Sequence, residues 1–199
     1  MKKLLTLLGL SALLLTGLFA QTAEERAAAL AYLQKTEAGV IDGAKGLSAA
    51  QLNFKSAPEK WSVGEVLEHL ASSEDFLMTT VHEQVMKGPA RPAGEDVKAI
   101  DAMILQVIPD RTQKFQAPEP LKPNNRYGSP QDALAHFEAS RGKTIAFLND
   151  TKDLRDHAID SPLGKKLDGY QWLLFIAAHS ERHTKQLLEV KADPNFPKS

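Results

Sequence analysis

The last helical segment of the sequence reads Asp168-Gly-Tyr-Gln-Trp-Leu-Leu-Phe-Ile-Ala-Ala-His179-Ser-Glu-Arg-His183-Thr-Lys-Gln-Leu-Leu-Glu-Val190. Residues four apart lie one above the other on an α-helix, so His179 and His183 share a face. At about 100° per residue, that face is also the apolar one. Its apolar members are Trp172, Phe175, Ile176, Leu187 and Val190. The pattern therefore predicts that both histidines point into the core of a helical protein.

A buried neutral imidazole has one donor and one acceptor, and leaving either without a partner costs roughly 1–3 kcal/mol. A divalent metal ion shared by the two rings would satisfy both acceptors. The alternative is a pair of core histidines with ordinary hydrogen-bond partners. The zinc-protease helix pattern is excluded, because it needs Glu where this chain has Ser180. The inverted pattern is excluded as well, because Arg182 stands where it needs Glu.

The chain has 199 residues, which is enough for one domain with a substantial core. It opens with Met1-Lys-Lys3, continues with a mostly apolar run at 4–15 and reaches a small residue at Ala20. A basic start, a short apolar stretch and a small final residue are typical of a secretory signal peptide. We therefore expect residues 1–20 to be removed and residues 21–199 to form an exported domain, periplasmic or secreted.

The alternative for this segment is an uncleaved anchor, because Leu18 is larger than the residue preferred three positions before a cleavage site. Cleavage would remove two lysines and leave 22 basic against 25 acidic residues, a net charge of −3. That balance argues against nucleic acid as a partner, and we expect no membrane contact beyond the N-terminal segment. The absence of cysteine excludes disulfides, thiolate ligands and a cysteine nucleophile.

Four segments have a helical period, and each begins with a capping residue followed three positions later by an acid or an amide. These signatures are Thr22–Glu25, Ser62–Glu65, Ser129–Asp132 and Asp168–Gln171. We predict helices over residues 23–44, 63–87, 131–149 and 168–192. No strand alternation appears, so the sequence predicts an all-α fold, a four-helix bundle.

The connection between the second and third helices, residues 88–128, is the least regular part of the chain and holds six of the eleven prolines. Apolar residues at positions 97, 100, 104 and 107 predict one short helix before Pro109. Long loops in compact domains are often lids or binding loops, so we expect such a role for this connection.

Three charged residues need an interpretation. Glu37 lies in the apolar stripe of the first helix, either at its wet edge with a basic partner or as an inward carboxylate near the site. Arg141, on the inward stripe of the third helix, either reaches an anionic ligand or lays its stem on the core with its head in water. Glu65 is expected to be a capping partner. No catalytic residue is assigned.

A metal site on the last helix needs a third ligand. Of the remaining histidines, His82, His136 and His157 are expected at the surface, because they lie off the apolar stripes or in a polar link. His69 flanks the apolar stripe of the second helix and can face the neighbouring helix. His69, His179 and His183 would then form a three-histidine site between the second and fourth helices.

The stretch Trp61-Ser-Val-Gly-Glu-Val-Leu-Glu-His69-Leu, followed much later by His179-Ser-Glu-Arg-His183-Thr-Lys-Gln186, resembles the DinB-like, or YfiT-like, superfamily of metal-dependent hydrolases. The resemblance covers nearly all of the mature chain. It implies a bundle with an up-down-down-up course, a divalent metal held by His69, His179 and His183, and often a homodimer. It makes Gln186 a candidate for orienting a ligand, the alternative being a polar position of the bundle with no role in the site. The signal peptide is a departure, because better-known members are cytosolic.

The resemblance and the three histidines lead to one main hypothesis: an exported metal-dependent hydrolase that uses a metal-bound water. Imidazole ligands favour zinc or nickel, with iron as a third option. The alternatives are a metal-dependent thiol S-transferase and a non-enzymatic stress protein that binds a metal or a ligand. The small-molecule substrate is not indicated by the sequence.

Overall fold

The computed structural model describes residues 21–198. The predicted signal peptide, residues 1–20, lies outside the described residues. The α-helices are α1 (Ala23–Ala44), α2 (Ala49–Asn53), α3 (Val63–Thr80), α4 (Val97–Val107), α5 (Pro130–Asp150) and α6 (Gly169–Lys191). A π-helical turn spans Val81–Val85 and a 3-10 turn spans Glu119–Leu121. Two short strands, β1 (Ala158–Asp160) and β2 (Lys166–Asp168), complete the described elements.

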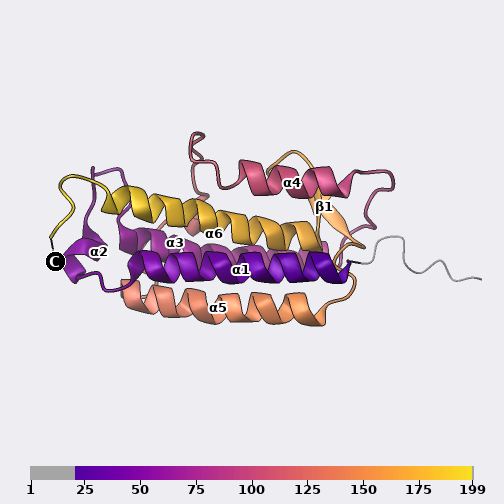
Figure 1. Ribbon diagram of the computed structural model, residues 1–199, viewed down its shortest axis with the longest axis horizontal. Coiled ribbons are helices and arrows are strands. Elements are labelled where there is room, and N and C mark those ends of the chain that lie inside the picture. The colour runs from indigo at the N-terminus through magenta and orange to yellow at the C-terminus, as the bar shows by residue number, and fades with distance from the viewer. Residues whose placement is uncertain (1–20, 199) are drawn as a thin grey trace, which may run out of the picture.

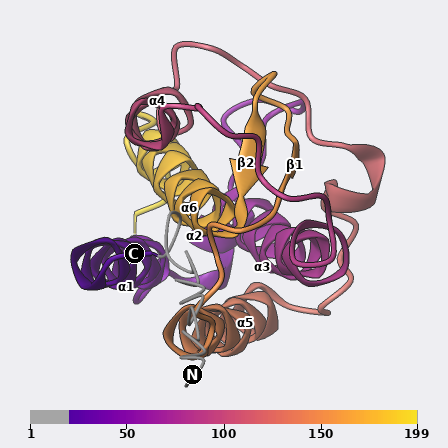
Figure 2. The same ribbon diagram turned by 90° about the vertical axis from the view of Figure 1, so that its right-hand side faces the viewer.

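The four long helices α1, α3, α5 and α6 form a bundle (Figure 1). Helices α1 and α6 run in the same direction: the Tyr170 hydroxyl donates to the Glu25 carbonyl at one end, and Lys191 Nζ donates to the Gly43 carbonyl at the other. Helices α3 and α5 also run parallel to each other and opposite to the first pair, as Figures 1 and 2 show. This is the up-down-down-up course, so the predicted four-helix bundle is confirmed.

The sequence located the helix starts correctly because each carries its own cap. Thr22, Ser62 and Asp168 each accept a hydrogen bond from the amide three residues later, and the side chain of that later residue bonds back, which completes a capping box. Ser129 accepts from the Asp132 amide, with Pro130 at the first helical position. Within residues 21–198, none of the helices combines the length and apolarity needed to cross a membrane.

The second predicted helix is longer than the α-helix observed. Regular α-helix ends at Thr80, and the chain continues through the π-helical turn to Val85. The short helix expected before Pro109 is present as α4, which packs on α6. Figure 2 shows α4 lying outside the bundle, beside α6.

The polar link before the last helix contains structure that the sequence prediction missed. Strands β1 and β2 pair antiparallel, with Ala158 opposite Asp168, and lie at the start of α6. Each strand has only three residues, which is too short for an alternating pattern to be recognised in the sequence. The sequence analysis, which found no strand alternation, therefore did not predict this hairpin.

Arg141 corrects a second expectation, because it neither reaches a ligand nor extends to water. Its side chain is fully buried, and Nε and Nη2 donate to the two carboxylate oxygens of Glu74 at 2.8 Å each. The remaining guanidinium hydrogens go to the Leu33 carbonyl and to the hydroxyls of Thr36 and Ser180. The guanidinium thus joins α1, α3, α5 and α6 at the centre of the bundle.

Candidate metal centre

Three histidines from two helices meet between α3 and α6. His69 lies on α3, and His179 and His183 lie one turn apart on α6. The Nε2 atom of His179 is 3.3 Å from Nε2 of His69 and 3.1 Å from Nε2 of His183. Within residues 21–198, these histidines form the one group of three or more metal-capable side chains whose ligand atoms converge closely. The predicted set is therefore brought together.

The outer nitrogens of two rings have acceptors that fix their tautomers. Nδ1 of His69 is 2.8 Å from the carbonyl oxygen of Leu121, and Nδ1 of His183 is 2.8 Å from Oε1 of Gln186. Because a carbonyl oxygen can only accept, both Nδ1 atoms carry the hydrogen. The Nε2 atoms of both rings therefore present lone pairs to the centre, as metal-ligating histidines do.

The spacing of the nitrogens is that of a metal site. Two imidazole nitrogens bound to one tetrahedral ion at about 2.0–2.1 Å lie about 3.3–3.4 Å apart. The distances of 3.1 and 3.3 Å are close to this separation. Without an ion, the donors available to the lone pairs of His69 and His183 are at most one hydrogen on Nε2 of His179 and the Ser73 hydroxyl, which lies 3.4 Å from Nε2 of His69. The donor set thus fits a divalent metal.

The surroundings keep the three rings neutral. Burial lowers the pKa of His69 and outweighs the opposite effect of its hydrogen bond to the Leu121 carbonyl. Burial also holds the pKa of His179 and of His183 well below the ordinary value, and the neighbouring histidines and arginines act in the same direction. Metal binding requires unprotonated imidazole, so these shifts favour binding at neutral pH.

Aromatic rings and one hydroxyl surround the centre. The ring of Trp61 lies 4.9 Å from that of His69 and 6.4 Å from that of His183, and Phe175 stacks on His179 at 6.5 Å. Ser73 Oγ is 3.4 Å from Nε2 of His69. His69 and His183 are buried, whereas His179 is partly exposed. The centre is therefore flanked by aromatic rings, and His179 is the most exposed of its three histidines.

The other histidines lie outside this group. His82 is exposed, and His136 is partly exposed and pairs with Asp75 at 2.6 Å. His157 is half-buried, with Nδ1 bonded to the Gly88 carbonyl, so it is less exposed than the sequence suggested. Glu65 completes the capping box of α3, as predicted.

Glu37 is half-buried on α1. Burial raises its pKa, and the charged residues that act on it are Arg141, Glu138 and Glu74. These residues belong to α5 and α3, so the electrostatic environment of Glu37 is that of the face between α1 and α5. The three histidines are not among the groups that shift its pKa.

Sequence reasoning found Gln186 but missed Leu121. A backbone carbonyl has no sequence signature, and position 121 is 52 residues from the histidine that it contacts. The one available signal was the irregular connection at residues 88–128. Because we expected it to be a lid or binding loop, some part of it was expected near the site.

Comparison with known proteins supports the fold and the family. The family model of the DinB superfamily matches residues 21–187. An uncharacterised protein of Bacillus subtilis (strain 168), YuaE, is 30% identical over 148 residues, which cover 74% of this chain and 87% of the relative.

A solved structure from Bacillus subtilis, YfiT, is described as a probable metal-dependent hydrolase with an unusual four-helix bundle topology. It superposes with a TM-score of 0.53 at 18% identity, covering 86% of this chain and 88% of the other. At this identity the likeness shows the fold. The family model and the YuaE match together show the family: the chain belongs to the DinB superfamily.

Proposed function

We propose that this protein is a metal-dependent hydrolase whose divalent ion is held by His69, His179 and His183. The observation that carries the proposal is the convergence of three Nε2 atoms, two of them with tautomers fixed by Leu121 and Gln186. YfiT, which has a similar fold, is described as a probable metal-dependent hydrolase, which is the same class of reaction. Zinc or nickel suits three imidazoles best, and iron is the next option.

When bound, a divalent ion with three protein ligands supplies a Lewis acid and lowers the pKa of a water molecule toward neutrality. The residues of the chain provide the rest. Gln186 and the Leu121 carbonyl hold two rings in place, and Trp61 and Phe175 exclude water from the flanks. His179 is the most exposed of the three histidines, and we expect the substrate to approach from its side.

Apart from the histidines themselves, Ser73 is the one polar side chain of residues 21–198 that lies within hydrogen-bond distance of a proposed ligand atom. Its hydroxyl lies 3.4 Å from Nε2 of His69, and the residue is 2% exposed. Within residues 21–198, no carboxylate is hydrogen-bonded to the three imidazoles. We therefore assign no general base from the protein and expect Ser73 to orient the group that approaches the metal.

The proposal is tested by hydrolysis assays on a panel of small ester, amide and lactone substrates, with the protein loaded with zinc, nickel or iron. We expect activity that depends on the metal, disappears with a chelator and is absent from the triple His69→Ala, His179→Ala, His183→Ala variant. Hydrolysis that survives chelation and the triple substitution would contradict the proposal. Tight metal binding without turnover on any substrate would favour the non-enzymatic alternative.

The proposal includes export, which the sequence of residues 1–20 suggests. Mass spectrometry of the protein from its native host tests this part separately. We expect a mature chain that begins at Gln21. A chain that retains Met1 and remains in the cytosol would contradict export and would make thiol transfer the stronger alternative.

A further inference from the structure

Two charged residues stand directly before two of the histidines: Glu68 before His69 and Arg182 before His183. Both side chains are buried, at 7% and 6% exposed. Both bind the backbone of the same segment, residues 108–126 in the connection between α4 and α5, which we call the strap. The acid binds N–H groups at one end of the strap, and the base binds carbonyls at the other.

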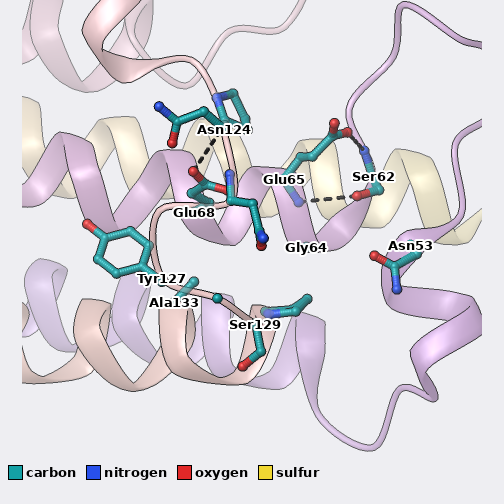
Figure 3. Close-up of a pocket in the computed structure, with 13 residues that line it drawn as sticks. Asn53, Ser62, Gly64, Glu65, Glu68, Asn124, Tyr127, Ser129 and Ala133 are labelled. Carbon is teal, nitrogen blue, oxygen red and sulfur yellow. Dashed lines mark hydrogen bonds between the residues drawn. The ribbon is translucent and has the colours of Figure 1, made fainter.

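Glu68 holds the C-terminal end of the strap. Its two carboxylate oxygens accept the backbone N–H groups of Asn124, Asn125 and Arg126 at 2.8, 2.9 and 3.1 Å. Figure 3 shows the Glu68 side chain reaching up from α3 to the loop at Asn124, at the edge of a pocket of about 320 Å³. Three consecutive N–H groups turn toward one carboxylate because Asn125 adopts a φ of 65°, a geometry that makes an anion-binding nest.

Arg182 holds the N-terminal end. Its guanidinium donates to the carbonyls of Ile108, Asp110 and Gln113, and the ring of Phe115 lies 5.1 Å from its central carbon. These contacts fix the strap on α6 immediately beside His183.

Between its two anchored ends, the strap contacts both outer rings of the centre. The Leu121 carbonyl accepts from Nδ1 of His69. Nη1 of Arg111 donates to Oε1 of Gln186 at 3.3 Å, and the same oxygen accepts from Nδ1 of His183. A second interaction, the ion pair between Arg111 and Glu189, fixes the guanidinium in this position. The strap therefore determines the orientation of two rings, one directly and one through Gln186.

We propose that Glu68 and Arg182 are positioning residues that anchor the strap so that it sets the tautomers and orientations of His69 and His183. The inference rests on the proposed metal site. Removing the anchor at Glu68 frees Leu121, lets the His69 ring rotate or exchange its tautomer, and weakens the ligand set. Substitutions of residues that orient metal ligands typically cost about 10–100-fold in metal affinity.

The test compares Glu68→Gln with Glu65→Gln in the otherwise intact protein. Glu65 is a matched control, because it lies one turn earlier on the same helix and bonds to Ser62 and Lys55 rather than to the strap. The zinc dissociation constant is measured at pH 7.5 by competition with a chromophoric chelator, beside the thermal unfolding midpoint of the metal-free protein. We expect Glu68→Gln to raise the dissociation constant about 10–100-fold. Glu65→Gln should leave it within about twofold, because glutamine can still complete the capping box and only the exposed ion pair with Lys55 is lost.

A second pair of variants tests the strap without touching α3. Asn125→Gly keeps access to positive φ and should keep the wild-type zinc affinity. Asn125→Val resists positive φ, distorts the nest and should weaken zinc binding in the same direction as Glu68→Gln. This pair remains informative if Glu68→Gln does not fold.

A third measurement does not need the metal. Nitrogen-15 chemical shifts of the metal-free protein report which ring nitrogen of each histidine carries the hydrogen. We expect His69 in the wild type to hold it on Nδ1, and a mixture of tautomers in Glu68→Gln. A wild type that binds zinc, beside a Glu68→Gln variant with unchanged affinity and tautomer, would overturn the role of the strap alone. Failure of the wild type to bind any divalent metal would instead overturn the proposed function.

Discussion

Arg141 on α5 is hydrogen-bonded to each of the other three long helices of the bundle. Its guanidinium uses all its hydrogens on partners from three other helices and forms a bidentate pair with Glu74. Thr144 Oγ1 donates to the same carboxylate at 2.8 Å. A buried ion pair of this kind adds little net stability over an apolar pair, but breaking it leaves an uncompensated charge in the core.

We therefore predict that Arg141→Leu lowers the free energy of unfolding by about 3–5 kcal/mol, because Glu74 loses its partner. Urea denaturation followed by circular dichroism measures the loss. The exposed Lys143 on the same helix is the control, and Lys143→Leu should change stability by no more than about 0.5 kcal/mol. A loss below about 1 kcal/mol in Arg141→Leu would contradict the central position of the ion pair.

Contacts between side chains on different helices were the part of the structure that the sequence did not predict. The inward position of Arg141 followed from the apolar stripe of its helix, but both interpretations of it were wrong. Its partner Glu74 is 67 residues away, on a helix whose rotation the sequence does not fix. The histidines were easier, because His179 and His183 are one turn apart and only His69 had to be found elsewhere.

At the scale of the elements, the first turns of α3 and α5 approach each other closely at Gly64. A Cβ atom at this position would lie 2.8 Å from Pro130 Cγ and 3.2 Å from the Leu52 carbonyl oxygen. Gly142, in the middle of α5, has no neighbour within 4 Å of the same virtual atom. Two glycines within helices of one bundle thus stand in opposite environments.

Gly64→Ala should destabilise the protein by about 1–3 kcal/mol, because the added methyl forces the two helix starts apart. Gly142→Ala should stabilise it by about 0.5–1 kcal/mol, since alanine restricts the unfolded chain and meets no obstacle in the helix. Unfolding midpoints of the two variants in one experiment provide the comparison. Equal effects of the two substitutions would show that the close approach at Gly64 does not exist.

The long helices were predictable because local signals and long-range packing agree on them. Period, caps and stop signals all lie within each segment, and α4 was found in the same way. The π-helical turn after Thr80 and the two three-residue strands were not predictable, because their pairing depends on contacts between separate segments. A one-turn extension of a helix has the same periodicity whether its hydrogen bonds are α or π.

At the scale of the whole molecule, the buried histidines couple stability to pH. The pKa values of His179 and His183 are well below the ordinary 6.5 in the folded protein, and that of His69 is also lowered. As the pH falls below 6.5, these histidines bind protons in the unfolded chain but stay neutral in the folded chain, where their pKa values are lower. Stability therefore decreases with falling pH in this range.

We predict that the free energy of unfolding of the metal-free protein is nearly constant above pH 7 and decreases from pH 6.5 toward pH 5. Denaturant titrations across this range test the slope. The triple His69→Ala, His179→Ala, His183→Ala variant should lose most of it, because the three imidazoles are absent. An identical slope in this variant would mean that other groups cause the pH dependence.

Zinc should raise the unfolding midpoint of the wild type, because only the folded chain holds the three ligands in register. At a free zinc concentration 100 times the dissociation constant, the stabilisation is about 2.7 kcal/mol. The triple variant should show no such increase when thermal unfolding is followed with and without zinc. An equal increase in both proteins would place the bound ion elsewhere.

The most direct measurement is X-ray absorption at the zinc edge of the purified, zinc-loaded protein, together with its zinc content. We predict one zinc per chain with three imidazole nitrogens at about 2.0–2.1 Å, and loss of this spectrum in the triple variant. Substoichiometric zinc, or a coordination shell with fewer than three imidazoles, would contradict a metal held jointly by His69, His179 and His183.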